Sequence, residues 1–281
     1  MAQDRSYPPV PAALPSPVTD NHAHLEPFQG FPDQPLSLAD QVAAAATAGV
    51  SRIVQCGCDL AAARWTVDVA IRHPAVVGAI AIHPNDAARL ATAGGFSPAV
   101  AEIAELARAN PRIRAIGETG LDYYRTAGDG RQAQIDAFRQ HISLAKELGL
   151  ALQIHDREAH HDVVSLLEAD GAPERTVFHC FSGDRELARL AGQRGWYCSF
   201  AGTVTFASAG ELRLAVSELP PELILAETDS PYLTPHPFRG RPNAPYMTAL
   251  TINTLAQAMA MTLEEACLQI QSNTTAVYGQ W

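Results

Sequence analysis

The chain has 281 residues and a formal net charge of -10, with 20 Lys and Arg residues against 30 Asp and Glu residues. This balance argues against a protein that coats duplex nucleic acid through a broad basic face, although it leaves room for a local basic site. With 47% hydrophobic and 18% charged residues, the chain can bury a large core and is not a disordered polyelectrolyte. It contains no apolar run of about 18 residues and no apolar stretch at its N-terminus, so we expect neither a membrane span nor a secretory signal.

Residues 1–17 contain five prolines. Proline fixes φ and lacks a backbone N–H, so this segment can sustain neither a helix nor a central strand. We therefore expect an extended or disordered lead-in over residues 1–17, followed by a single domain over residues 18–281.

After the lead-in, short apolar runs alternate with longer helical patterns. Eight runs rich in Val, Ile and Leu are candidate strands: Pro17–His22, Ser51–Cys58, Val76–His83, Arg112–Glu118, Ala151–His155, Thr176–Cys180, Trp196–Phe200 and Glu222–Asp229. The clearest helical patterns between them are Leu38–Gly49, Arg131–Gly149, Asp184–Gly195 and Ala209–Leu219. The first three of these patterns end at a glycine, which is a common helix stop.

Strands that are apolar on both faces and alternate with helices indicate a parallel sheet in an α/β protein. Eight such units predict a (β/α)8 barrel of the TIM type, with functional residues at the C-terminal ends of the strands. A doubly wound open sheet is the alternative. No GxGxxG sequence follows the first run, which disfavours the dinucleotide-binding version of that fold.

The five cysteines include no CxxC pair. Cys56 and Cys58 would share one face of a strand. We interpret them as reduced, buried residues of a cytoplasmic protein rather than as a thiolate metal site.

Residues of metal-binding type lie at the ends of several predicted strands: His22, His24, Glu118, His155, His179 and Asp229. A His-x-His sequence on an extended segment directs both imidazoles to one side, where they can hold one cation. A glutamate can bridge two cations, and the histidines at the ends of the fifth and sixth runs can hold the second. Two ions about 3.5–4 Å apart would lower the pKa of a bound water and stabilise both the attacking and the leaving oxygen.

Four of these residues also have a specific structural alternative. Glu118 could cap the next helix, His155 and His179 could be hydrogen-bonded core histidines, and Asp229 could be a helix N-cap. We favour the metal site because it explains all of these residues at once. Without it, every separate alternative would have to be true at the same time, each at the end of a strand.

Several sequence strings follow one another in a recognisable order: TDNHAHL at 19–25, IHP at 82–84, IGETGLDYY at 116–124, QIHDREAH at 153–160, FHCFSG at 178–183, ETDSPYLTP at 227–235, RGRPN at 239–243 and SNTTAVY at 272–278. With these strings the chain resembles the TatD-related metal-dependent hydrolases, a family often described as deoxyribonucleases, from about residue 18 to residue 280. The resemblance implies a TIM-type barrel with a site for two divalent metals.

The resemblance also implies roles for individual residues. His22 and His24 would bind one ion, His155 and His179 the other, and Glu118 would lie between them. Asp229 would be both a ligand and the proton acceptor. His83 corresponds to a residue near the scissile phosphate, with packing against Pro84 as its alternative, which gives Asp229, Glu118 and His83 as the expected catalytic residues.

Three features depart from the family pattern. Ala244 follows Asn243 where an acidic residue is usual, and we expect this change to loosen the loop after the eighth run. Thr119 replaces an apolar residue or a cysteine, which we interpret as a packing change. The proline-rich lead-in lies outside the pattern.

Substrate contacts are expected from residues that follow the strands: His83, Arg157, His160, Tyr123 and Arg239. Cationic side chains would neutralise a phosphodiester, and an aromatic ring would stack on a base of a single strand. The alternatives are an ordinary surface charge for an arginine and packing beneath a loop for the tyrosine.

The leading hypothesis is a metal-dependent deoxyribonuclease that degrades DNA from a 3′ end and favours single strands, as the resemblance suggests. Two alternatives stay open: a deacylase, esterase or phosphatase with the same metal pair, and a metal-stabilised scaffold without catalysis. The ligands suit two divalent ions such as Zn, Mg or Mn. We expect DNA as the partner, no membrane, no stable protein partner and a cytoplasmic location.

Overall fold

The computed structural model describes residues 4–27 and 35–281, and these residues contain the eight strands that the sequence predicts. Each predicted apolar run overlaps one strand. The strands are β1 Val18–Ala23, β2 Val50–Gly57, β3 Val76–Ile80, β4 Ile113–Asp122, β5 Ala151–Arg157, β6 Thr176–Phe178, β7 Tyr197–Phe200 and β8 Ile224–Ala226. They pair in parallel and follow the order β1 to β8.

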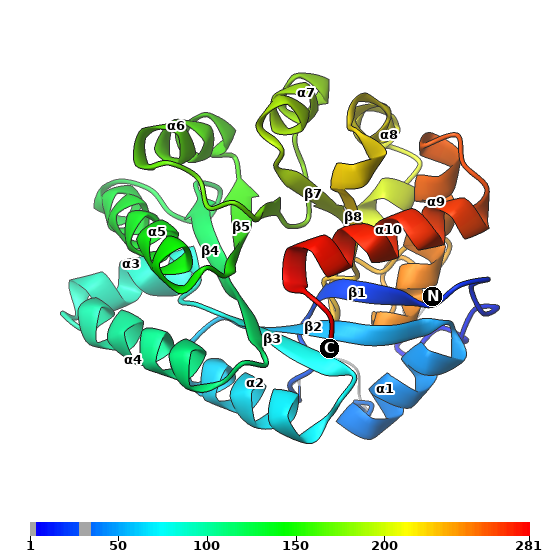
Figure 1. Ribbon diagram of the computed structural model, residues 1–281, viewed down its shortest axis with the longest axis horizontal. Coiled ribbons are helices and arrows are strands. Elements are labelled where there is room, and N and C mark those ends of the chain that lie inside the picture. Colours follow the sequence, from blue (N-terminus) through cyan, green and yellow to red (C-terminus); the bar gives the residue numbers. More distant parts are fainter. Residues whose placement is uncertain (1–3, 28–34) are drawn as a thin grey trace. The chain divides into compact units, whose positions relative to one another are not determined.

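Helices alternate with these strands (Figure 1). The α-helices are α1 Leu38–Thr47, α2 Leu60–Arg72, α3 Pro84–Thr92, α4 Phe96–Ala109, α5 Asp129–Leu148, α6 His160–Asp170, α7 Arg185–Arg194, α8 Gly210–Glu218, α9 Thr248–Ala258 and α10 Leu263–Tyr278. Short 3₁₀ helices are η1 Gly202–Thr205, η2 Pro221–Leu223 and η3 Pro245–Met247. Gly149 and Gly195 adopt left-handed conformations just after α5 and α7, where the sequence predicts glycine stops. No helix among the described residues has the length and apolar character needed to cross a membrane.

The chain divides into two compact units. Unit 1 comprises residues 1–55 and 183–276, and unit 2 comprises residues 56–182 and 277–281. Each unit contains both strands and helices.

In unit 1, β1 pairs with β2 and β7 pairs with β8. An isolated parallel bridge joins Ala23 to Ser230, which brings the end of β1 next to the segment that follows β8. Asn273 on α10 donates hydrogen bonds to the carbonyls of Pro221 and Ile224 and so fixes the start of β8. Helices α7 and α8 lie side by side (Figure 1).

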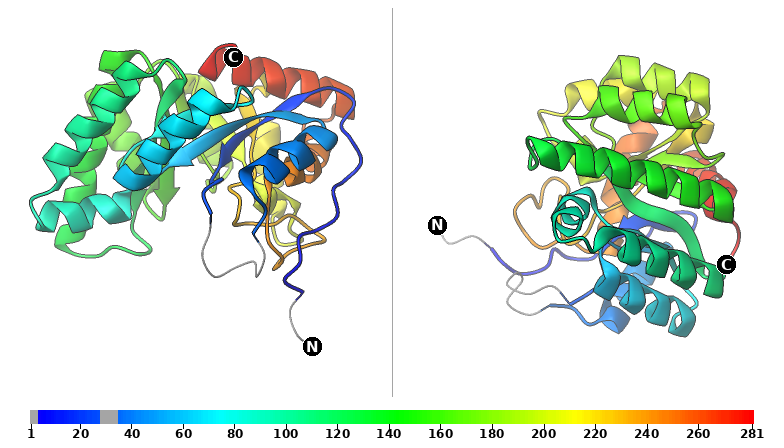
Figure 2. Two further views of the ribbon diagram at one scale, coloured as in Figure 1. Left: turned by 90° about the horizontal axis from the view of Figure 1, so that it is seen from below. Right: turned by 90° about the vertical axis from the view of Figure 1, so that its left-hand side faces the viewer.

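The described part of the lead-in runs as an extended chain into β1 and makes specific contacts within unit 1 (Figure 2). Arg241 donates to the carbonyls of Ser6 and Tyr7, and the Tyr246 hydroxyl donates to the carbonyl of Pro8. Ala244 is fully buried in a cluster against which Tyr7 packs. The small side chain at 244 therefore lies in a packed part of the loop, not in a loosened one.

In unit 2, β3, β4, β5 and β6 pair in sequence. Strand β4 continues to Asp122, beyond the predicted end at Glu118, because its register with β5 continues to the pair of Asp122 with Arg157. Gly120 permits this pairing, since a Cβ atom there would lie 2.1 Å from the carbonyl oxygen of His155. Glu118 is thus held within a paired strand.

Candidate metal centre

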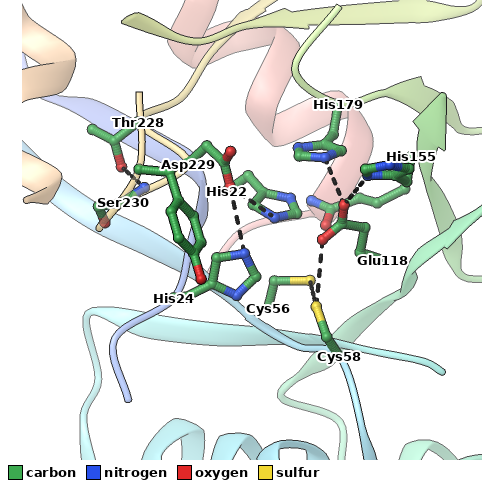
Figure 3. A network of polar contacts seen from close by, with 12 residues as sticks. His22, His24, Cys56, Cys58, Glu118, His155, His179, Thr228, Asp229 and Ser230 are labelled. Atoms are coloured by element: carbon green, nitrogen blue, oxygen red, sulfur yellow. Dashed lines mark hydrogen bonds and ion pairs between the residues drawn. The ribbon is translucent and has the colours of Figure 1, made fainter. Parts of the chain in front are cut away.

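Unit 1 brings together His22, His24 and Asp229 (Figure 3). The Nε2 atoms of His24 and His22 lie 3.5 Å and 3.9 Å from Oδ1 of Asp229. The two imidazole rings meet edge to face with centroids 5.1 Å apart. Because a ligand atom from each residue lies within 4.8 Å of the others, the three side chains have the spacing to surround one cation.

Backbone contacts fix this cluster. The Asp229 N–H donates to the carbonyl of His22 at 2.9 Å, and the His24 N–H donates to the carbonyl of Ser230 at 2.8 Å. Asp229 lies three residues beyond the end of β8 and has a φ of 54°, a conformation that costs energy for a residue other than glycine. The surrounding hydrogen bonds maintain that conformation and aim its carboxylate at the two histidines.

A buried aspartate supports the segment before Asp229. Asp20 accepts hydrogen bonds from the Thr228 N–H at 2.8 Å and the Thr228 hydroxyl at 2.6 Å. Burial raises the pKa of Asp20 to about 8, although the bonds from Thr228 oppose this change. Asn243, from the RGRPN string, donates to the carbonyls of Thr228 and Tyr232 on either side of Asp229.

Unit 2 gathers three histidines around the buried carboxylate of Glu118. Two of them, His155 and His179, are labelled in Figure 3. The Oε1 atom of Glu118 lies 2.5 Å from Nδ1 of His155, 2.9 Å from Nε2 of His179 and 3.6 Å from Nε2 of His83. Burial alone raises the pKa of Glu118, but His179, His83 and His155 outweigh it and hold the pKa well below its usual value. In the metal-free protein this glutamate is therefore ionised.

Asp122 belongs to the same cluster and was missed by the sequence analysis. Its Oδ2 atom lies 3.4 Å from Nε2 of His155 and accepts a hydrogen bond from Asn85 at 3.0 Å. Burial lowers the pKa of His155, but hydrogen bonds to Asp122 and Glu118 raise it to about 9. The available signal was strand alternation, which places residues 118 and 122 on one face of β4.

The donor chemistry of both clusters fits divalent cations. Neutral imidazole and carboxylate are the ligands that Zn, Mn and related ions accept in proteins. His83, Glu118 and His155 form a second set with ligand atoms within 4.8 Å of one another. A carboxylate on the far nitrogen of a ligating histidine is a common support at metal sites, and Asp122 has that position relative to His155.

The predicted substrate residues of unit 2 are exposed or half-buried and lie at or beyond the ends of the strands, with Arg157 as the last residue of β5. The Arg157 guanidinium stacks 4.0 Å above the ring of Tyr124. Tyr123 donates from its hydroxyl to Asp162, and Arg131 lies over its ring. His160 begins α6, with Nδ1 2.7 Å from Oδ2 of Asp156.

Arg239, predicted from the loop after β8, belongs to unit 1. Its guanidinium lies 4.5 Å from the ring centroid of Phe206, and its side chain is exposed. The structure therefore leaves the face of this guanidinium that points away from the ring available to solvent.

Comparison with known proteins identifies the family. A family model described as "TatD related DNase" matches residues 19–279. The chain belongs to this family. It is 42% identical over 266 residues to "Uncharacterized metal-dependent hydrolase TatD" of Mycobacterium tuberculosis, covering 93% of this chain and 98% of that protein. It is 37% identical to "Uncharacterized metal-dependent hydrolase YabD" of Bacillus subtilis, covering 88% of this chain and 92% of that one.

Solved structures show the same fold. The TatD homologue YjjV of Escherichia coli has a TM-score of 0.82 at 24% identity and covers 94% of this chain and 98% of its own. A TatD family hydrolase of Entamoeba histolytica has a TM-score of 0.80 at 21% identity, with 95% and 99% of the two chains covered. The predicted (β/α)8 barrel of the TIM type is confirmed, and the chain is a TatD-family metal-dependent hydrolase.

Proposed function

We propose that this TatD-family hydrolase is a deoxyribonuclease that removes nucleotides from the 3′ end of single-stranded DNA. The observation that carries the proposal is the carboxylate–histidine cluster in each unit, beside the C-terminal ends of the strands. Enzymes with this fold hold their reactive groups at those ends. The description of the matching family as a DNase supports DNA over other substrates.

Each cluster would hold one divalent ion, Zn, Mg or Mn. His22, His24 and Asp229 would bind one, and Glu118, His155 and His179 would bind the other. Bound ions would supply positive charge that attracts a phosphate and lowers the pKa of water.

Asp229 is proposed as the group that accepts the proton of the attacking water. Its carboxylate is partly exposed, and its backbone is fixed by the hydrogen bond to His22. An aspartate held in one orientation can take a proton without first reorganising its surroundings.

His83 is proposed as a hydrogen-bond donor to a phosphate oxygen. Its Nδ1 atom accepts a hydrogen bond from the Asn85 N–H at 3.2 Å. This contact leaves Nε2, the atom that faces the cluster, as the ring nitrogen that can donate a hydrogen bond. A proton on Nε2 would neutralise charge that develops on the phosphate.

Two guanidinium–aromatic pairs near the C-terminal ends of β4 and β5 support a single-stranded substrate. Arg157 pairs with Tyr124, and Arg131 pairs with Tyr123. Such pairs can bind a phosphate and stack on a base at the same place. The net charge of -10 favours one chain end entering a local site over a duplex lying on a broad surface.

The proposal also covers the domain organisation and the cellular location of the enzyme. One family match across residues 19–279 supports a single hydrolase domain over residues 18–281. The five cysteines carry no disulfide, which supports a cytoplasmic location, where thiols stay reduced.

The decisive experiment is a timed digest of a 5′-labelled single-stranded DNA oligonucleotide, read on a sequencing gel. Chelated protein is compared with protein resupplied with Mg, Mn or Zn, and Asp229→Asn is the control. A metal-dependent ladder that shortens from the 3′ end, absent with the variant, is the expected result. If folded protein leaves the oligonucleotide uncut with all three metals, DNA is not the substrate, and aryl esters, amides and phosphomonoesters are tested next.

A further inference from the structure

Cys58 directly follows Gly57, the last residue of β2, and so lies at the C-terminal end of a strand. Its Sγ atom is 3.4 Å from Oε2 of Glu118 (Figure 3), and its side chain is half-buried. The sequence predicts a buried structural role for Cys58, but the side chain is only half-buried and this contact places its sulfur beside the carboxylate–histidine cluster of unit 2.

The two oxygens of Glu118 have different surroundings. Oε1 faces His155 and His179, whereas Oε2 faces the sulfur of Cys58. A carboxylate can bind a cation through either oxygen. A cation bound through Oε2 would therefore lie beside a sulfur donor, while one bound through Oε1 would lie beside imidazoles.

The backbone holds Cys58 in this position. Its carbonyl accepts a hydrogen bond from the His83 N–H at 2.8 Å. The next residue, Asp59, caps α2 by accepting from the Ala62 N–H at 2.8 Å. Gly57 allows α2 to begin so close to the strand, because a Cβ atom at 57 would lie 2.8 Å from the Ala62 carbonyl oxygen. The sulfur is thus presented by a fixed strand end.

We propose that Cys58 is a metal ligand on the Oε2 side of Glu118 and biases the centre towards thiophilic divalent ions such as Zn and Co over Mg and Mn. Thiolate donors favour the former ions, whereas the latter prefer oxygen. As the metal–sulfur bond forms, the thiol releases its proton to solvent. This inference rests on the metal centre of the proposed function but not on DNA as the substrate.

Cobalt substitution tests the proposal without an activity assay. Metal-stripped, reduced protein is loaded with Co(II), and its absorption spectrum is recorded for the wild type, Cys58→Ser, Cys58→Ala and the matched control Cys56→Ala. We expect a near-ultraviolet sulfur-to-cobalt charge-transfer band in the wild type and in Cys56→Ala. Both Cys58 variants should bind cobalt, as their visible bands will show, but lack the charge-transfer band.

Competition titrations against a metal-sensitive chelator provide the second readout. Cys58→Ser should lower the affinity for Zn relative to that for Mn by about tenfold or more, the scale expected when support for a bound metal is lost. Circular dichroism verifies that each variant is folded. The proposal is overturned if wild-type protein binds cobalt without the band, if the band persists in Cys58→Ser, or if no cobalt binds. If the oligonucleotide stays uncut but the charge-transfer band is present, the nuclease proposal is rejected and the assignment of Cys58 as a metal ligand stands.

Discussion

The Nδ1 atom of His155 lies 2.5 Å from Oε1 of Glu118. Since the pKa of His155 is raised to about 9 and that of Glu118 is held well below its usual value, the metal-free protein contains an imidazolium–carboxylate pair at neutral pH. A cation that binds through Nδ1 of His155 would have to displace the proton of this pair.

Metal binding should therefore release protons and become tighter as pH rises. Below a pKa of about 9 the proton on His155 competes with the metal, so the apparent affinity should increase by up to about tenfold per pH unit. Titration calorimetry at pH 7.5 in two buffers of different ionisation enthalpy counts the protons released. His155→Gln should release about one proton fewer, whereas the exposed His161→Gln should match the wild type. Equal heats in both buffers would refute the prediction.

Asp229→Asn should lower kcat by at least a hundredfold, because an amide cannot accept the proton of the attacking water. The comparison is made by steady-state kinetics on the oligonucleotide, with metal content measured for each protein. Asp136→Asn, an exposed substitution on α5, is the matched control and should behave as the wild type. A folded, metal-loaded Asp229→Asn with normal turnover would disprove the assigned role.

Arg157→Ala should raise KM for single-stranded DNA by about tenfold and change kcat little, because its stack on Tyr124 would contribute to binding alone. A small aryl phosphodiester, too short to reach the stack, should be hydrolysed equally by both proteins. The exposed Arg72→Ala controls for the loss of one positive charge. An equal loss on both substrates would assign Arg157 to the reaction centre instead.

His141 should make the metal-free protein sensitive to acid. Its ring contacts the Thr119 hydroxyl, and burial lowers its pKa to about 4, against about 6.5 in the unfolded chain. The folded state thus binds fewer protons than the unfolded state between these values. The difference in the pKa of His141 therefore contributes about 3 kcal/mol to the free energy of unfolding. This contribution is fully present above pH 6.5 and is lost as the pH falls towards 4.

Urea unfolding of metal-free protein at pH 7 and pH 5 checks this effect. His141→Gln should lose less stability than the wild type over that interval, even if its stability at pH 7 is lower. The exposed His161→Gln should follow the wild type. An identical loss in His141→Gln would show that other groups cause the acid sensitivity.

The lead-in should stabilise unit 1. The Tyr246 hydroxyl is buried and donates to the carbonyl of Pro8, so Tyr246→Phe should cost about 1 kcal/mol in the free energy of unfolding. Deletion of residues 1–9 should cost more, because it also removes the partners of Arg241. Tyr124→Phe, on an exposed ring, is the control in urea unfolding. A deletion that leaves the midpoint unchanged would show that these contacts contribute nothing.

The alternation of strands and helices was predictable from sequence because apolar runs and glycine stops are local signals. The ends of the strands were less predictable from the sequence. β4 continues past Glu118 because it pairs with β5 as far as Arg157, and β8 ends at Ala226 although the apolar run extends to Asp229. Both ends depend on hydrogen bonds to a partner strand, which a single run does not specify.

The candidate ligands were chosen from sequence because each lies at the end of a predicted strand, although Glu118 lies within β4 in the structure. The contacts that these and nearby side chains make with one another were not predictable. The sequence does not reveal that Asp122 contacts His155, that Tyr123 bonds Asp162 or that Cys58 reaches Glu118. These pairings depend on strand register and on the paths of loops, which tertiary packing decides.

The hydrogen bonds between Asp20 and Thr228 span 208 residues of sequence. A nascent chain emerging from the ribosome therefore exposes His22 and His24 long before Asp229 exists to join them. Throughout that interval the two histidines lack the carboxylate that completes their cluster. A cation held by all three side chains would therefore acquire its full set of ligands only after residue 229 has been synthesised.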